Sequence, residues 1–291
     1  MKVRDIAFIG LGRMGRPMAA RLAAAGYAMR VYDKAVSARI RGASPCASPG
    51  EAALGAQVLI TMLPDGRAVR SALLGLRGAA AALAPGSIVI DMSSSDPMAT
   101  RELGRKLATR GIELLDAPVS GRVEGARNGT LTIMAGGNAA TLRKVRPVFQ
   151  VLGKRIFHAG PLGAGHAVKA LNNYIAAAGT IAAFEAVIVG RAFGLDPKLM
   201  TDIFNNSAGR NSTTENKVKQ HVLSGRYGSG FALALMAKDV GIAAALARAV
   251  GVEAPLTKRT RGLWRGAQAG LPEGADHTEM YRYLARPKPK S

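Results

Sequence analysis

A lysine and an asparagine share one face of a long apolar helix that the sequence predicts from about residue 165 to 194. His166, Lys169 and Asn173 are spaced i, i+3 and i+7, and Asn172 lies beside them. A lysine at the root of a buried helix is costly unless it is paired or functional. Asn173 can bind a carbonyl or hydroxyl oxygen while Lys169 gives or takes its proton. Spacing alone does not separate this role from a solvated first turn with the amine in water.

A second group of polar residues follows a predicted strand over residues 112–116. Ser120 and the backbone amides of Gly121 and Arg122 can hold a carboxylate, although a plain Pro/Gly connection without a ligand has the same composition. Further along, Lys238 precedes Asp239 near the start of a helix. Taken by itself, that pair favours a surface salt bridge.

These side chains need a scaffold, and the first 17 residues predict one. The apolar run over residues 6–9 is followed at once by G-x-G-x-x-G and a helix, the arrangement that binds a dinucleotide pyrophosphate. Gly10 permits a tight turn, Gly12 lets the backbone approach the phosphates, and Gly15 lets the helix pack near the strand. The predicted cofactor-binding loop is Gly10, Leu11, Gly12, Arg13, Met14 and Gly15.

The acidic residue that ends the next apolar segment predicts which dinucleotide binds. Asp33 lies about 20 residues past the glycines, where an acid accepts hydrogen bonds from the adenosine ribose and repels a 2′-phosphate. We therefore expect NAD, with NADP as the alternative because Lys34 and Arg39 are cations close by.

Strand and helix patterns alternate through the first half of the chain and then stop. Buried strands are predicted over residues 57–63, 87–91, 112–116 and 130–134, with helices over 16–25, 68–83 and 97–109. This predicts an α/β fold with a doubly wound parallel sheet of the Rossmann type. After residue 157 only helical patterns follow. The predicted division is a dinucleotide-binding domain over 1–163, a long connecting helix over 164–194 and an all-helical domain over 195–291 that serves substrate binding and oligomerisation.

Composition narrows the class of protein. The chain has 291 residues, 48% of them hydrophobic, which is ample for a core. Cys46 is the single cysteine, which fits a reducing compartment, and the chain enters its first strand without room for a signal peptide. We therefore expect a cytoplasmic protein. The longest apolar stretch, residues 175–193, contains Glu185 and Arg191 and predicts a buried helix rather than a membrane span.

The net charge of +21 raises the question of nucleic-acid binding. No run of basic residues exceeds two, so the sequence lacks a clustered patch and we expect no nucleic-acid partner. A positive field still favours anionic cofactors and substrates. No metal site is predicted.

Taken together, these motifs resemble the β-hydroxyacid dehydrogenase family, which includes 3-hydroxyisobutyrate dehydrogenase and tartronate semialdehyde reductase. The resemblance covers nearly the whole chain and rests on six motifs in order. They are the glycine loop with Pro17-Met18, Met62-Leu63-Pro64, Asp91-Met-Ser-Ser94, Asp116-Ala-Pro-Val-Ser-Gly121 with Gly125 and Gly129, Gly163-x-Gly165-x-x-x-Lys169-x-x-Asn172-Asn173, and Phe231-x-Leu-x-Leu-Met-x-Lys238-Asp239. Ser94 stands where a threonine is usual.

The resemblance implies a role for each motif. Lys169 is expected to be the catalytic acid and base, Asn173 to hold the substrate, and Ser120 with Gly121 to bind its carboxylate. Leu63, Pro64 and Ser94 are expected to line the cofactor, with Lys238 on its nicotinamide side. The implied activity is hydride transfer between NAD(P) and a small anionic β-hydroxy acid or its semialdehyde. Family members are commonly homodimers or homotetramers built through the helical domain.

One departure from the family pattern concerns the substrate. The substrate loop usually has Ser-Gly-Gly, and here its third residue is Arg122. Its side chain can bind a second anionic group of the substrate or can point to solvent, with only its amide in use. Two other functions remain open from sequence alone: an imine reductase on the same fold, whose members usually lack the lysine, and a non-catalytic dehydrogenase-like binding module.

Overall fold

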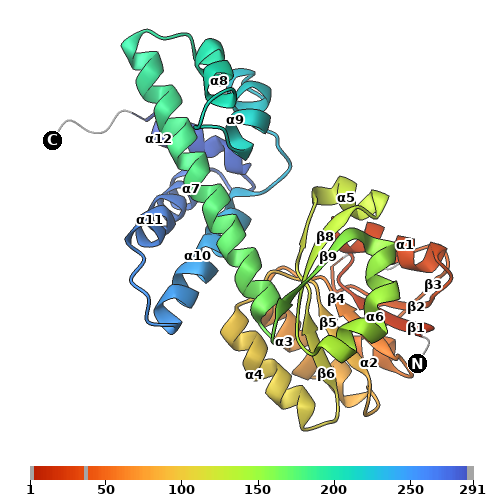
Figure 1. Ribbon diagram of the computed structural model, residues 1–291. Coiled ribbons are helices and arrows are strands. Elements are labelled where there is room, and N and C mark those ends of the chain that lie inside the picture. The colour runs from red at the N-terminus through yellow and green to blue at the C-terminus, as the bar shows by residue number, and fades with distance from the viewer. Residues whose placement is uncertain (1–2, 36–38, 287–291) are drawn as a thin grey trace. The chain divides into compact units, whose positions relative to one another are not determined.

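The computed structural model describes residues 3–35 and 39–286, which form two compact units, with the division of the chain after Lys169 (Figure 1). The first unit contains a nine-stranded sheet in the order β3-β2-β1-β4-β5-β6-β8-β7, with β9 beside β8. Its strands are β1 (Asp5–Ile9), β2 (Ala28–Tyr32), β3 (Ala43–Pro45), β4 (Val58–Thr61), β5 (Ile88–Asp91), β6 (Glu113–Asp116), β7 (Val119–Ser120), β8 (Leu131–Gly136) and β9 (Gly153–Gly160).

Helices cover both faces of this sheet, because strand residues alternate between two apolar cores. Ile6 and Phe8 belong to one core and Ala7 and Ile9 to the other. The first core includes residues of α1 (Gly15–Ala24), α5 (Arg122–Asn128) and α6 (Ala139–Leu152). The second includes residues of α2 (Pro49–Ala53), α3 (Gly66–Leu74), a 3-10 turn at Ala79–Ala81 and α4 (Pro97–Ala108). The predicted doubly wound α/β fold is confirmed.

The prediction of a parallel sheet is right for one part of it and wrong for another. All neighbours from β3 to β6 are parallel. β8, however, runs antiparallel to β6 and β7. The chain between β7 and β8 contains only the short α5, too little for the crossover that parallel neighbours require. It therefore turns back and pairs antiparallel.

The predicted helix over residues 68–83 is also wrong in its extent. α3 ends at Leu74, and the chain resumes a helical turn only at Ala79. Gly78 explains part of the break, because a Cβ there would lie 2.6 Å from the carbonyl oxygen of Leu73. Arg77 adopts a left-handed backbone with φ 57°, which no α-helix continues.

The second unit is helical, as predicted, and no strand occurs among its described residues beyond an isolated bridge between Ala232 and Asp276. Its fully buried side chains include Phe184, Val187 and Trp264. Its elements are the greater part of α7 (Ala164–Phe193), then α8 (Pro197–Asn205), α9 (Ser212–Asn216), a π-helical turn (Val218–Leu223), α10 (Leu233–Ala249), α11 (Pro255–Gly270), a 3-10 turn (His277–Glu279) and α12 (Met280–Leu284).

α7 crosses the boundary between the two units as one uninterrupted helix. It is long and apolar enough to span a membrane by length and composition alone, a test that core helices of soluble proteins also pass. Ala177, Phe184 and Val187 are fully buried in the core of the second unit, so one side of α7 is a core face. The division into residues 1–163, 164–194 and 195–291 stays a prediction.

Candidate active site

The register of the parallel strands brings the ends of five strands into one row. Tyr32 pairs with Ile9, Ile9 with Thr61, Thr61 with Asp91 and Asp91 with Asp116. Each candidate motif of the first half starts just beyond this row, at the carboxyl edge where open α/β sheets bind ligands. The residues that follow the row are Gly10, Asp33, Leu63, Pro64, Ser94 and Ser120.

Two glycines of the loop are required by the protein's own packing. Gly10 has φ 101°, and a Cβ there would lie 2.3 Å from the carbonyl oxygen of Met62. At Gly15 a Cβ would lie 1.9 Å from the carbonyl oxygen of Gly10. The turn and the close approach of α1 to β1 therefore both depend on glycine.

Gly12 is required by neither packing nor conformation. It is exposed, its φ is not positive, and a Cβ there would meet no atom within 4 Å. Among the described residues, nothing accepts a hydrogen bond from the amides of Gly12, Arg13 or Met14, and α1 has no side-chain cap. Open space and free amides at a helix N-terminus are what a pyrophosphate needs, so the loop fits a dinucleotide.

Asp33 contacts the glycine loop directly. Its carboxylate accepts hydrogen bonds from the amides of Leu11, at 2.5 Å, and Ala35, at 2.7 Å. The side chain is half-buried. Asp33 therefore fixes the loop as well as standing where the sequence predicts a ribose contact, and this first role was not predicted.

Leu63 is part of the same group. Its side chain lies where a Cβ on Gly10 would come within 2.9 Å, and its amide donates to the Ser93 hydroxyl at 2.9 Å. Pro64 follows it, exposed, and Asp65 caps α3 by accepting from the amide of Ala68 at 2.8 Å. The structure thus brings Leu63 beside the glycine loop and ties it to the segment that carries Ser94.

The predicted substrate loop contains regular secondary structure, because Ser120 lies in a strand and Arg122 begins a helix. Ser120 belongs to β7 and pairs with Thr132 of β8. Gly121 has φ 139°, and the exposed Arg122 has φ 58°, a left-handed conformation that a residue with a Cβ rarely adopts. The glycine usual at this position in the family would adopt that conformation without strain.

Asn173 is held by a partner that the sequence did not assign to it. Its side-chain amide donates to Asp239 of α10 at 2.6 Å, and its oxygen accepts from Asn172 at 3.2 Å. The pair of Lys238 and Asp239 is present at 3.4 Å, but Asp239 is only 3% exposed, so the expected surface salt bridge is instead largely buried. Asp239 therefore orients the side-chain amide of Asn173.

Lys169 is half-buried on α7, one turn after His166. His166 itself is 1% exposed and lies among polar groups of the first unit. Asp116, at the end of β6, caps α7 by accepting from the amides of Gly163 and His166, both at 2.7 Å. The sequence placed His166 on the face of Lys169 but gave no sign of these partners, which lie about 50 residues away along the chain.

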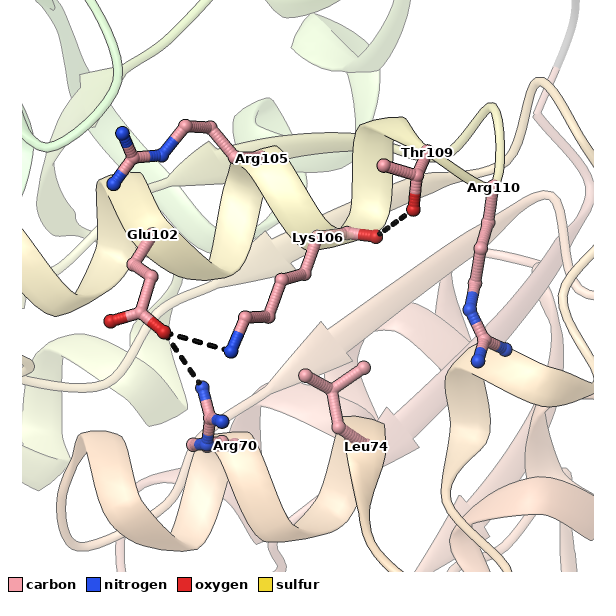
Figure 2. Close-up of a pocket in the computed structure, with 7 residues that line it drawn as sticks. All are labelled: Arg70, Leu74, Glu102, Arg105, Lys106, Thr109 and Arg110. Atoms are coloured by element: carbon pink, nitrogen blue, oxygen red, sulfur yellow. Dashed lines mark hydrogen bonds and ion pairs between the residues drawn. The ribbon is translucent and has the colours of Figure 1, made fainter.

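A pocket of about 630 Å³ lies outside this site (Figure 2). It is an open groove between α3 and α4, where Glu102 binds Arg70 at 3.5 Å and Lys106 at 2.8 Å. Arg105 and Arg110 add to its positive charge. The groove contains none of the predicted site residues. Among the residues described, no group of three or more His, Cys, Asp or Glu side chains is placed to hold a metal.

Two family models match successive parts of the chain. The NAD-binding domain of 6-phosphogluconate dehydrogenase matches residues 5–160, and the NAD-binding domain of NADP-dependent 3-hydroxyisobutyrate dehydrogenase matches residues 163–284.

Individual proteins are similar over almost the whole length. The NAD-dependent L-serine dehydrogenase of Pseudomonas aeruginosa is 40% identical, with 90% of this chain and 92% of the relative covered. The 2-(hydroxymethyl)glutarate dehydrogenase of Eubacterium barkeri is 37% identical, with 91% and 89% covered. A structure of 3-hydroxyisobutyrate dehydrogenase from Mycobacterium tuberculosis with L-serine aligns with a TM-score of 0.89 at 34% identity, covering 98% of this chain and 100% of the other.

Proposed function

The chain belongs to the 3-hydroxyisobutyrate dehydrogenase family of β-hydroxyacid dehydrogenases, and from this premise we propose that it oxidises a 3-hydroxy acid with a primary hydroxyl group, using NAD. It is an NAD(P)-dependent β-hydroxyacid dehydrogenase, and its substrate is a small hydroxy acid.

The substrate class follows from what the relatives' substrates share. Serine, 3-hydroxyisobutyrate and 2-(hydroxymethyl)glutarate, named in the similar proteins, each carry a CH2OH group on the carbon next to a carboxylate. They differ only in the other substituent of that carbon. We assign this chain to substrates with the same skeleton, and the anionic character of the carboxylate agrees with the net charge of +21.

The observation that carries the proposal is the cross-sheet row ending in Asp116, with open space beside Gly12. It gathers the glycine loop, Leu63 and Ser120 at one edge of the first unit, so a dinucleotide bound at the glycine loop and Leu63 can have the substrate beside Ser120. In this assignment the amides of Gly12, Arg13 and Met14 bind the pyrophosphate. Leu63, Pro64, Ser94 and Lys238 line the rest of the cofactor.

A bound nicotinamide would supply the acceptor for the hydride that leaves the hydroxyl-bearing carbon. The neutral amine of Lys169 takes the hydroxyl proton as the C–H bond breaks, giving the semialdehyde, NADH and a protonated lysine that then releases its proton. Asn173, oriented by Asp239, donates its remaining N–H to the substrate. Ser120 and the amides of Gly121 and Arg122 hold the carboxylate. In the reverse direction Lys169 returns the proton to the carbonyl oxygen.

NAD is assigned as the cofactor because of Asp33. A second negative group, such as the 2′-phosphate of NADP, is repelled by a carboxylate at the end of β2. Lys34 and Arg39 are exposed close by and reduce this discrimination without removing it. The assignment therefore predicts a preference for NAD and measurable activity with NADP.

A homodimer or homotetramer formed through the second unit is supported by its exposed apolar side chains. Ile175 and Val189 of α7 are 69% and 68% exposed, and Phe193 at its end is 83% exposed. Large exposed apolar side chains on one helix are typical of a protein interface. The single cysteine supports a cytoplasmic location.

NADH formation tests the proposal directly. The purified protein is assayed with NAD and with NADP over serine, 3-hydroxyisobutyrate, 3-hydroxypropanoate and 2-(hydroxymethyl)glutarate, with lactate as the matched control because its hydroxyl is on the carbon that bears the carboxylate. We expect turnover with at least one of the four and none with lactate. Turnover of lactate alone would contradict the substrate class.

A further inference from the structure

His166 joins three elements of the first unit to the start of α7. Its ring contacts the Ser93 carbonyl oxygen through Nε2 at 3.1 Å and the Thr100 hydroxyl through Nδ1 at 2.8 Å, while its backbone amide donates to Asp116. Ser93 follows β5, Thr100 belongs to α4, and Asp116 ends β6. A buried histidine with both ring nitrogens and its amide engaged has one allowed orientation.

The proton on Nε2 follows from its partner. A carbonyl oxygen only accepts, so the contact with Ser93 requires a proton on Nε2. The carboxylates of Asp91 and Asp116 lie 3.6 Å from Nε2 and 3.8 Å from Nδ1. The ring therefore lies close to two buried carboxylates, one at each of its nitrogens.

The start of α7 is also held closely against the sheet. At Gly165 a Cβ would lie 2.1 Å from the carbonyl oxygen of Met134, so helix and sheet backbones are in direct contact there. Asp116 binds the amides on either side of this contact, those of Gly163 and His166. The His166 ring adds the contact that fixes the rotation of the first turn about the helix axis.

The other end of this connection reaches the proposed cofactor site. The hydroxyl of Ser93 accepts a hydrogen bond from the backbone amide of Leu63. The backbone amide of Ser93 donates to the Asp91 carboxylate at 3.0 Å. A chain of hydrogen bonds thus runs from Leu63 through Ser93 to His166, and Lys169 lies one helical turn further on. All of these residues belong to the first unit.

We propose that His166 is the positioning residue that sets Lys169 relative to the cofactor loop, an inference that rests on the proposed proton-transfer role of Lys169. A displacement of about 1 Å in a reacting group costs on the order of 100-fold in rate. Without the His166 contacts the first turn of α7 rotates, and the lysine amine leaves its place. The loss then falls on kcat, because the amides that bind the pyrophosphate are untouched.

The experiment is a double-mutant cycle with His166→Phe and Lys169→Ala, with kcat, the Kd of NAD and the melting temperature measured for each protein. His166→Phe keeps a ring and removes both hydrogen bonds. We expect kcat to fall 10- to 100-fold with the Kd of NAD changed less than twofold. In the Lys169→Ala background the same substitution is expected to lower kcat less than twofold further, because there is no amine left to position. Losses that multiply in the double variant would overturn the inference and leave His166 as a structural residue.

Two further variants sharpen the cycle. His166→Gln can donate to the Ser93 carbonyl oxygen, so it is expected to recover part of the lost kcat relative to His166→Phe; equal losses would contradict the proposal. His277→Gln is the matched control, a buried histidine of the second unit bound to the carbonyl oxygen of Phe231. It is expected to lower the melting temperature with kcat unchanged.

The readouts also separate this inference from the proposed function. Full turnover in Lys169→Ala alone would refute the role of the lysine. Exchange of the His166 Nε2 proton, followed by NMR of protein labelled with 15N-histidine, reports on the hydrogen bond from His166 to the Ser93 carbonyl oxygen whether or not the protein turns over substrate. We expect slow exchange, and rapid exchange in the folded wild-type protein would refute the positioning role of His166.

Discussion

Two turns at the carboxyl edge of the sheet both contain residues with a left-handed backbone. They differ in whether the residue in that conformation carries a side chain. In the glycine loop the residue at φ 101° is Gly10, and packing demands that it has no side chain. In the substrate loop Gly121 at φ 139° is followed by Arg122 at φ 58°, where a side chain is present despite the strain. The cofactor turn is thus determined by backbone geometry, whereas the substrate turn accepts a strained side chain.

This difference has a physical basis in what each turn is proposed to bind. A pyrophosphate is the same in every reaction and is bound by backbone amides, so glycine is the best residue throughout. Hydroxy acids differ in one substituent, and only a side chain can distinguish them. A left-handed conformation costs a residue with a Cβ about 1–2 kcal/mol, and such strain tends to persist at functional sites.

The largest effect is expected at Lys169, because the proposed proton transfer depends on its side chain and not on the glycine loop. Lys169→Ala is expected to lower kcat by about 10²- to 10⁴-fold, the range for loss of general acid–base catalysis. The Kd of NAD, measured by fluorescence titration, is expected to stay within twofold of wild type. Unchanged turnover would remove Lys169 from the mechanism.

Within the glycine loop, we expect substitution of Gly15 to lower mainly the stability of the protein and substitution of Gly12 to lower mainly its affinity for NAD. Gly15→Ala is expected to lower the free energy of unfolding by about 1–3 kcal/mol, because its Cβ overlaps the backbone of Gly10. Gly12→Ala is expected to leave stability within about 0.5 kcal/mol and to weaken NAD binding by about tenfold or more. Urea unfolding and NAD titration of the two variants measure both quantities. Normal NAD affinity in a folded Gly12→Ala protein would contradict the fit of the loop to a pyrophosphate.

Asp33 is a side chain on which the glycine loop depends, because its carboxylate accepts from the amide of Leu11. Asp33→Asn retains an acceptor for the amide of Leu11 and removes the charge. The ratio of kcat/KM for NAD to that for NADP is expected to fall by about tenfold, comparable to one charge-assisted hydrogen bond. Asp33→Ala is the companion variant, expected to lower the ratio and also to loosen the loop, seen as a lower melting temperature. An unaltered ratio in both would count against NAD as the preferred cofactor.

Arg122→Gly removes the side chain from the strained turn and so tests whether that side chain costs stability and contributes to specificity. Relief of the left-handed conformation is expected to raise the free energy of unfolding by about 1 kcal/mol. If the arginine binds a second anionic group, KM for 2-(hydroxymethyl)glutarate rises while KM for serine does not. Equal changes in KM for both would leave Arg122 without a role in specificity.

The turn at Asp276 in the second unit has no proposed chemical role, so it is a reference for a polar side chain that contributes only to stability. Burial alone would raise the pKa of Asp276, but hydrogen bonds from Thr278 and Ser229 outweigh it, and the pKa lies below its ordinary value of 3.8. Because the folded-state pKa is the lower one, this stabilisation is complete above pH 3.8 and is lost as pH falls through the folded-state pKa. Asp276→Asn is expected to be less stable than wild type by about 1 kcal/mol at pH 7, with a smaller difference at pH 2. A difference that does not depend on pH would contradict the cause given.

What could be predicted from the sequence was mainly what depends on near neighbours. The glycine turn between β1 and α1, the α/β alternation and the long helix follow from spacing within a few residues, and these structural predictions were right. The break after Leu74 was missed because apolar spacing continued through Gly75 and Gly78. The partner of Asn173 is 66 residues away and the partners of His166 are 50 to 73 residues away, so no local pattern could assign them. Long-range hydrogen bonds of this kind become visible only when the sheet register is known.

The cross-sheet row from Tyr32 to Asp116 also bears on how such enzymes diversify. Ile9, Thr61, Asp91 and Asp116 are at most 1% exposed, so the strand ends form a buried frame that does not depend on the loops that follow. Loop segments can therefore be exchanged between related enzymes at these strand ends without a change in the strands themselves. Transplanting residues 120–122 from a relative with another substrate should change selectivity without disturbing the frame, which makes this edge a natural starting point for redesign.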